Sequence, residues 1–152
     1  MNLSQFFTAY HQNLSHFVKE EYRKDFEQTD RFFLILMFSQ WLLASTVGGL
    51  GFGHHQFGFI AGGVTTLFSL VAYRYYKGEA IARMIMGSSM AVFSIIFITQ
   101  QHGLIEAHFH YFIGIGVLIR YRDLTPLLVH TVIIVIHHVV FTYCQTINFE
   151  IF

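Results

Sequence analysis

Five apolar segments, each about 20 residues long and separated by short polar connections, dominate this sequence of 152 residues. A helix needs about 20 residues to cross the hydrocarbon core of a bilayer. Because hydrocarbon cannot satisfy backbone hydrogen bonds, a spanning segment of this kind must be helical. The segments cover residues 32–52, 57–76, 80–99, 104–119 and 124–143. We therefore expect an all-α, polytopic membrane helical bundle with about five transmembrane helices, the fourth being the shortest.

The composition supports a membrane environment. Hydrophobic residues make up 54% of the chain and charged residues only 12%. A soluble domain of this size could not bury so much apolar surface, so a lipid bilayer is the expected partner. The formal net charge is zero, which gives no support for nucleic-acid binding. The sequence has no phosphate-binding loop and no His-Glu-x-x-His motif, so nothing in it predicts an enzyme.

Residues 1–30 differ from the rest, because polar and aromatic residues alternate without the basic start and apolar core of a signal peptide. We expect a cytoplasmic amphipathic helix in the membrane interface. Its apolar side would hold Phe6, Tyr10, Phe17 and Val18, and its polar side Lys19, Glu20, Arg23 and Lys24. A poorly ordered tail is the alternative. Residues 31–152 would then form the transmembrane domain.

The basic residues predict the orientation of the bundle. All nine precede the first segment or flank the second and fourth connections: Lys19, Arg23, Lys24, Arg31, Arg74, Lys77, Arg83, Arg120 and Arg122. Cytoplasmic loops carry an excess of Lys and Arg, so the N-terminus is predicted to be cytoplasmic. Residues 123–126, Asp-Leu-Thr-Pro, are a helix-start signal, with Thr125 expected as the cap and Pro126 in the first helical position.

Seven of the ten histidines gather near the outer end of the bundle under this topology. They are His54, His55, His102, His108, His110, His137 and His138. The pairs at 108/110 and 137/138 come to similar depth, one to two turns below the outer end of their segments. Only His130 lies deeper, and only His11 and His16 are cytoplasmic. Chance scatter does not predict such a gathering.

The fourth segment carries the most informative polar cluster. His102, Glu106 and His110 are spaced i, i+4 and i+8, which places them on one face of a helix. His108 points roughly the opposite way, so one regular helix cannot aim His108 and His110 at the same small ion. A central charge in hydrocarbon costs about 2–3 kcal/mol on insertion scales, and a chain tolerates that cost more readily where the groups bind or relay something.

Three interpretations of this cluster stay open. Histidines and a carboxylate could hold copper, zinc or iron, or two facing histidines could hold a b-type haem. The same groups could form a hydrogen-bond or proton network without metal, or have structural roles only. The outer side carries no Lys or Arg to pair with haem propionates, which favours a bare ion over haem. In the first segment, Gln40 is expected to hydrogen-bond a neighbouring helix.

The stretch from Gln101 to Phe141 resembles a known family. Gly-Leu-Ile-Glu-Ala-His-Phe-His at 103–110, Tyr-Arg-Asp at 121–123, Pro-Leu-Leu at 126–128 and His-His at 137–138 carry the resemblance. It is to the multi-spanning N-terminal membrane sensor region of bacterial chemotaxis receptors, histidine kinases and diguanylate cyclases. By motif match it implies a ligand site made of Glu106, His108, His110 and His138, with His102 next. We add His137, His54 and His55 as further candidate ligands.

The sequence therefore predicts a sensor domain of the bacterial inner membrane. Its site would bind a metal ion or haem near the periplasmic side, and altered packing of the last two segments would signal to the turn at 120–123. The resembling regions usually continue into a cytoplasmic output domain, whereas this sequence ends at Phe152. A homodimer or a separate signalling partner is expected to carry the output. The alternatives are a haem-binding electron-transfer subunit and a proton or ion relay or transport protein.

Overall fold

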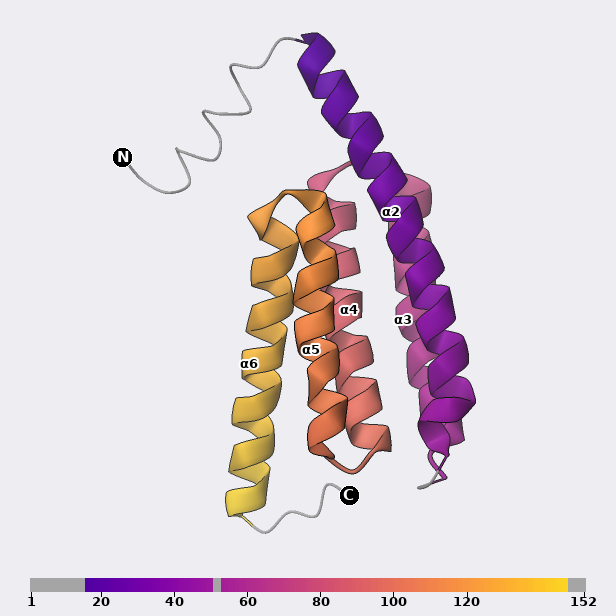
Figure 1. Cartoon of the computed structure of the whole chain (residues 1–152), viewed down its shortest axis with the longest axis vertical. Helices are drawn as coiled ribbons and strands as arrows, with labels where there is room; N and C mark the ends of the chain where they lie inside the picture. The colour runs from indigo at the N-terminus through magenta and orange to yellow at the C-terminus, as the bar shows by residue number, and fades with distance from the viewer. Residues whose placement is uncertain (1–15, 51–52, 148–152) are drawn as a thin grey trace, which may run out of the picture.

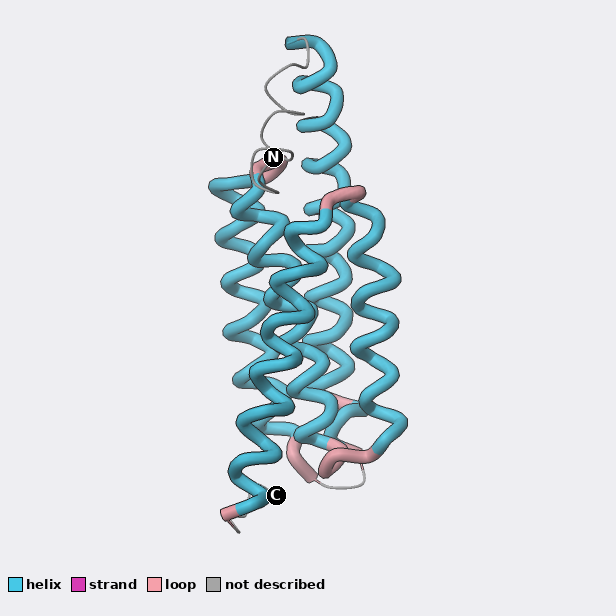
Figure 2. The backbone as a smooth tube through the Cα atoms, turned by 90° about the vertical axis from the view of Figure 1, so that its left-hand side faces the viewer, coloured by secondary structure: helices cyan, strands magenta, loops and turns pink. Residues whose placement is uncertain are grey.

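The computed structural model describes residues 16–50 and 53–147, and within these residues every regular element is a helix. The α-helices are α2 (His16–Ser45), α3 (His55–Tyr76), α4 (Ala80–Gln100), α5 (Ile105–Leu118) and α6 (Leu124–Thr146). Two short 3-10 turns, η1 (Val47–Gly49) and η2 (Ile119–Tyr121), follow α2 and α5. The helices run up and down side by side (Figures 1 and 2). The all-α prediction is confirmed.

Four helices, α2, α3, α4 and α6, are long and apolar enough to cross a membrane. Helix α5 has only 14 residues, or about 21 Å of length against a hydrocarbon core of about 30 Å. Its start is delayed because Gly103 has a φ of 76° and Leu104 is extended, with a ψ of 139°. The predicted segment at 104–119 is therefore helical, but its role as a fifth span stays a prediction.

Helix α4 lies at the centre of the bundle and packs against α2, α3, α5 and α6 (Figure 1). In the most apolar stretch of 18 residues of α4, 61% is buried inside the bundle. The corresponding stretch of α6 is only 11% buried. The outward faces carry large apolar side chains, among them Phe68, Phe112 and Val139. Such faces are stable in contact with lipid and costly in water, so the arrangement indicates a multi-pass membrane protein in a bilayer.

A glycine brings α4 and α6 into close contact. A Cβ atom added to Gly87 would lie 2.5 Å from the backbone oxygen of Pro126. Small residues let two helix backbones approach in this way in membrane bundles. The start of α6 is therefore positioned by α4.

The connections form two ends of opposite character (Figure 1). The N-terminal part of α2, the α3–α4 connection and the α5–α6 turn share one end, here called the basic end, to which all nine Lys and Arg residues belong. The opposite end, here called the histidine end, holds residues 46–50, 53–54 and 101–104 and the last turn of α6. Which side of a membrane each end faces stays a prediction.

Helix α2 continues without a break across residues 30 and 31, the predicted boundary between the interfacial segment and the transmembrane domain. Its first turns project past the ends of the other helices (Figure 1). There Arg23 pairs with Glu27 at 3.3 Å and Lys24 with Glu21 at 3.2 Å, spacings that favour a continuous helix. Residues 1–15 lie outside the described residues, so the interfacial helix stays a prediction.

The cap of α6 differs from the prediction. The helix begins at Leu124, and the Asp123 carboxylate accepts a hydrogen bond from the backbone N–H of Thr125 at 2.9 Å. Thr125 was therefore the wrong residue for the cap, because the carboxylate two positions earlier already satisfies its amide. Pro126 lies in the third helical position, where its missing N–H costs nothing because the first four amides have no partner in a helix.

Candidate functional site

Three imidazoles line one small pocket between α5 and α6 at the histidine end. His108 comes from α5, and His137 and His138 come from α6. The pocket has a volume of about 200 Å³ and is completed by Ile98, Gly103, Phe141, Thr142 and Gln145. None of these side chains carries a formal charge when the imidazoles are neutral. A bound cation would therefore be held by neutral nitrogen and oxygen donors.

The rings of His108 and His138 lie close enough to share a ligand. Their centroids are 5.9 Å apart with an interplanar angle of 60°. Two imidazoles that bind one ion through nitrogen have centroids about 5–6 Å apart, given metal–nitrogen distances near 2 Å. Tyr111 packs against both rings, with centroid distances of 5.9 Å to His108 and 5.5 Å to His138. The two helices thus present one pair of facing imidazoles.

The helix backbone sets the tautomer of both rings. Nδ1 of His108 lies 3.0 Å from the Leu104 carbonyl, and Nδ1 of His138 lies 3.0 Å from the Ile134 carbonyl. A carbonyl oxygen only accepts, so each Nδ1–H donates and each neutral ring keeps a lone pair on Nε2. This is the arrangement of metal-ligating histidines, in which a hydrogen bond at one nitrogen fixes the other for the metal.

His137 lines the same pocket but packs differently. Its ring stacks obliquely on Phe141 at a centroid distance of 4.1 Å and meets His138 edge-on at 5.7 Å. Within residues 16–50 and 53–147, no three His, Cys, Asp or Glu side chains are already arranged to hold a metal ion. The pocket therefore offers a pair of imidazoles, with His137 as the nearest candidate for a third donor.

Glu106 and His102 stand apart from this pocket. Glu106 is exposed in the first turn of α5, where its charge interacts favourably with the helix dipole. His102 lies in the turn before α5, with a φ of 50°. The prediction that His102, Glu106 and His110 share one helix face is therefore wrong for His102, because α5 begins only at Ile105.

His102 instead meets His54 across the two connections of the histidine end. Their Nε2 atoms are 2.8 Å apart, so one ring donates a hydrogen bond and the other accepts it. The buried Gln100 supports this pair by donating to the carbonyls of Ala44 at 2.7 Å and His54 at 3.0 Å. His55 is half-buried beside Gly49, where an added Cβ would lie 2.4 Å from its Nδ1.

His110 points into the bundle, away from the pocket. Its Nδ1 lies 2.7 Å from the Ser94 hydroxyl and its Nε2 lies 3.3 Å from Nε2 of Gln40. The expected hydrogen bond from Gln40 to a neighbouring helix is thus confirmed. His130 is fully buried deeper in the bundle. The residue spacing had indicated that His108 and His110 face different ways, and the structure separates them accordingly.

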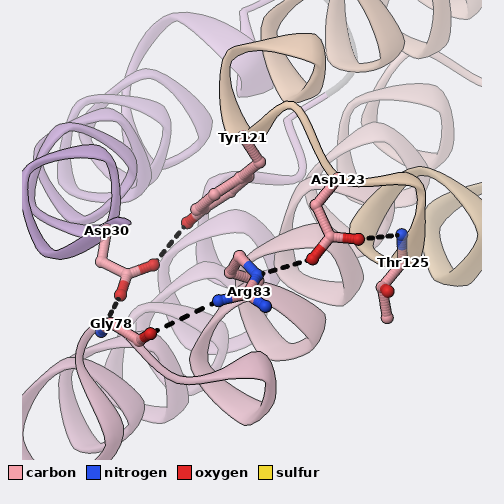
Figure 3. A network of polar contacts seen from close by, with 6 residues as sticks. All are labelled: Asp30, Gly78, Arg83, Tyr121, Asp123 and Thr125. Carbon is pink, nitrogen blue, oxygen red and sulfur yellow. Dashed lines mark hydrogen bonds and ion pairs between the residues drawn. The ribbon is translucent and has the colours of Figure 1, made fainter. Parts of the chain in front are cut away.

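A polar network at the basic end, shown in Figure 3, is not predicted by the sequence analysis. Asp30 on α2 is fully buried. One of its oxygens accepts from the backbone N–H of Gly78 and the other from the Tyr121 hydroxyl, both at 2.7 Å. Gly78 has a φ of 79°, and an added Cβ would lie 2.9 Å from Glu27 Cγ, so no other residue fits this turn without strain.

Arg83 links this network to the start of α6. Its Nε donates to Asp123 at 2.8 Å, a second guanidinium nitrogen donates to the Gly78 carbonyl at 3.4 Å, and its charge lies 4.0 Å from the Phe26 ring centroid. Burial alone would raise the pKa of Asp123, but the Thr125 amide and the Arg83 guanidinium outweigh it and hold this pKa below its ordinary value.

Tyr121 is held neutral in the same network. Burial is the main cause that raises the pKa of its hydroxyl, and the neighbouring Asp30 carboxylate raises it further. Its ring stacks on Phe33 at a centroid distance of 4.8 Å. The turn between α5 and α6 is therefore anchored to α2 by packing as well as by hydrogen bonding.

The predicted ligands thus fall into separate groups. They are the pocket of His108, His137 and His138, the pair of His54 and His102, the half-buried His110, and the separate Glu106 and His55. Their role as ligands stays a prediction. Comparisons with protein-family models, with curated proteins and with solved structures give no match.

Proposed function

We propose that this chain is a multi-pass membrane sensory domain that binds a transition metal ion in the pocket between α5 and α6. The observation that carries the proposal is the facing pair of His108 and His138, whose Nδ1–H groups are both engaged by backbone carbonyls. Each ring therefore has its Nε2 lone pair available for a ligand. Copper, zinc and iron are the ions that imidazole suits best among common biological metals.

The size of the pocket favours an ion over haem. Cofactor and small-molecule sites usually have volumes of about 300–1,000 Å³. The pocket at His108 and His138 has a volume of about 200 Å³, and Thr142 and Gln145 are among its lining residues. This space suits an ion with one or two waters better than a macrocycle.

The turn that joins α5 to α6 connects the proposed site with the basic end of the bundle. A ligand that bridges His108 and His138 would change how these two helices pack near the histidine end. They meet again at the turn at 119–123, about 20 Å away by helix length. There Tyr121 and Asp123 bind Asp30 and Arg83, so a shift of this turn would reach α2 and α4. A two-state element along this route is the hypothesis.

The resemblance to bacterial membrane sensor regions supports the sensory role, since the His-x-His and His-His motifs supply the rings of the pocket. We further propose that the basic end is cytoplasmic, in the inner membrane of a bacterium, following the bias of Lys and Arg to cytoplasmic connections. The signal would pass from there to a second copy of the chain or to a separate partner.

The test is metal binding by the detergent-purified chain. We expect about one equivalent of zinc by elemental analysis after dialysis, lost in His108→Ala and in His138→Ala. His54→Ala is the matched control, because His54 belongs to the other imidazole pair and should leave this stoichiometry unchanged. Equal metal content in all three variants would overturn the proposal. A Soret band in the purified protein would instead support a haem-binding electron-transfer subunit.

A proton relay is the second candidate, favoured by buried polar side chains at several depths. Gln40, Ser94 and His130 lie in the core, and Ser69 on α3 bonds Ser89 on α4 at 2.8 Å. Proteoliposomes containing the chain would then conduct protons, and His130→Leu would abolish the flux. Flux no greater than in empty liposomes would eliminate this candidate.

A further inference from the structure

A sulfur atom and an imidazole nitrogen face each other across one amide in the middle of the bundle. Nε2 of Gln40 on α2 lies 3.3 Å from Sδ of Met90 on α4 and 3.3 Å from Nε2 of His110 on α5. Gln40 and Met90 are only 5% and 1% exposed. Side chains from α2, α4 and α5 therefore bring uncharged nitrogen and sulfur atoms together in the interior of the bundle.

The tautomer of His110 leaves a lone pair at this position. The Ser94 hydroxyl donates to the Met90 carbonyl at 3.1 Å, so it receives the Nδ1–H of His110 at 2.7 Å. The other ring nitrogen, Nε2, is then an acceptor. It faces the Gln40 amide, which shares its two N–H hydrogens between Met90 and His110.

His130 lies beside Met90. Its Nδ1 lies 3.4 Å from the Gly87 carbonyl, and its buried Nε2, near the Tyr111 backbone, makes no hydrogen bond of standard geometry among the described residues. Both His130 Nε2 and Met90 Cγ border Gly114, at 3.1 Å and 3.3 Å from the point where a Cβ would sit. The imidazole of His130 and the side chain of Met90 therefore both lie next to α5 at Gly114.

Two buried polar atoms of this group are left without partners, namely Oε1 of Gln40 and Nε2 of His130. Such atoms are rare in folded proteins and often mark the place of an ion or water. We propose that Met90, His110 and Gln40, with His130 beside them, form a site for a single Cu(I) ion. This site shares no residue with the pocket of His108 and His138.

The donor set selects Cu(I) among the biological metals. Thioether sulfur is a soft ligand that favours Cu(I), and imidazole accepts the same ion. A single positive charge is also easier to bury among neutral donors than a double one. The Gln40 amide nitrogen lies 3.3 Å from Met90 Sδ and 3.3 Å from His110 Nε2, so the sulfur and the imidazole nitrogen both lie around the end of the Gln40 side chain.

Gln40 supplies an oxygen by turning its amide. The two ends of a glutamine amide have nearly the same shape, so a rotation exchanges Nε2 for Oε1. Without a cation, Oε1 would face the lone pairs of sulfur and nitrogen, which is unfavourable. With Cu(I) bound, the same contact becomes attractive, and the partnerless oxygen gains a ligand.

The experiment is an anaerobic titration of Cu(I) against a chromophoric chelator. It uses the full chain in detergent with the double change His108→Ala/His138→Ala, so that the proposed outer pocket does not contribute. We expect one equivalent of Cu(I), with affinity lowered at least tenfold by Met90→Leu. Met86→Leu is the matched control, since Met86 is a fully buried methionine one turn away on the same helix. It should leave the affinity unchanged.

X-ray absorption gives an independent readout of the ligand set. One sulfur scatterer at about 2.3 Å is expected in the double variant and should disappear with Met90→Leu. Should Met90→Leu fail to fold, Ser94→Ala takes its place, because loss of the Nδ1 acceptor should weaken Cu(I) binding through His110.

Equal Cu(I) affinity in the Met90 and Met86 variants, or a spectrum without sulfur, would overturn the inference. A folded double variant that binds no Cu(I) would also overturn the inference. That result would not affect the proposed pocket of His108 and His138, whose metal binding is tested separately. Conversely, a pocket of His108 and His138 that binds no metal would not contradict the Cu(I) site.

Discussion

At the level of single residues, the tautomers of His108 and His138 matter most. Both residues lie in α-helices, and the Nδ1–H of each ring donates a hydrogen bond to the backbone carbonyl four residues earlier. The helix backbone therefore leaves Nε2 of each ring with a lone pair for a ligand. A different residue at either position would remove half of the proposed binding pair.

Acid should release the metal from this pair. Protonation of an imidazole removes the lone pair that binds the ion, so occupancy falls as the rings become charged. Because protons compete with the metal for these nitrogens, we expect the metal content of the purified chain to fall on acidification and to return after neutralisation. The measurement is elemental analysis after equilibrium dialysis at each pH. Unchanged content at pH 5 would argue against histidine ligation.

Asp123→Asn isolates the ion pair with Arg83, because asparagine caps a helix as well as aspartate does. The change should lower the free energy of unfolding by about 2 kcal/mol near neutral pH, since the pair is mostly buried. The folded state lowers the pKa of Asp123. Its stabilising effect is therefore complete above the ordinary carboxyl pKa of about 3.9 and is lost as the pH falls through the lower folded value.

Thermal unfolding of wild type and Asp123→Asn in detergent, followed by circular dichroism across pH, measures this effect. The difference in stability should be constant from about pH 6 to 8 and should shrink below about pH 4. A difference that grows in acid would contradict the assigned role of the carboxylate.

At the level of elements, the positions of the helices followed from local patterns, and their partners did not. Apolar runs of spanning length predicted α3, α4 and α6 to within a few residues. The continuity of α2 through Asp30 was missed because a charged stretch before an apolar run looks like a boundary. Asp30 is buried only because Tyr121 and Gly78 reach it, and Tyr121 lies 91 positions away.

The histidines show the same division between local and long-range information. Their spacing correctly placed His108 and His110 on different faces of one helix. It could not pair His54 with His102, because that contact depends on how two connections approach each other. It also could not show that His102 leaves the helix, since a positive φ at a histidine has no strong local signal.

The close packing of α4 on α6 can be tested at Gly87. A Cβ there would lie 2.5 Å from a backbone oxygen, which cannot move away as a flexible side chain could. Gly87→Ala should therefore lower the free energy of unfolding by about 2 kcal/mol. Gly116→Ala is the control, because nothing lies within 4 Å of its added Cβ. Both are measured by unfolding in detergent, and equal stability of the two variants would contradict the described packing.

At the level of the whole molecule, the basic residues and most of the described histidines lie at opposite ends of one bundle. If the basic end is cytoplasmic, the proposed metal pocket faces the periplasm and the network of Asp30, Arg83 and Asp123 faces the cell interior. In the proposed sensor, the first is the binding end and the second the output end, and α5 and α6 join them.

Single cysteines can report the orientation. With Cys144→Ser as background, Gln56→Cys should react with a membrane-impermeant maleimide in intact spheroplasts, because residue 56 lies exposed at the histidine end. Glu79→Cys, exposed at the basic end, should react only after the membrane is opened. The reverse labelling pattern would place the histidine end in the cytoplasm.

The most direct measurement of the central claim is the number of nitrogen ligands around one added equivalent of Cu(II). Electron paramagnetic resonance of the purified chain resolves nitrogen coupling from bound imidazole. At least two nitrogen ligands are expected for the wild type, and one fewer in His108→Ala and in His138→Ala. A wild-type spectrum identical to that of the variant lacking both histidines would contradict the claim that α5 and α6 hold the metal between them.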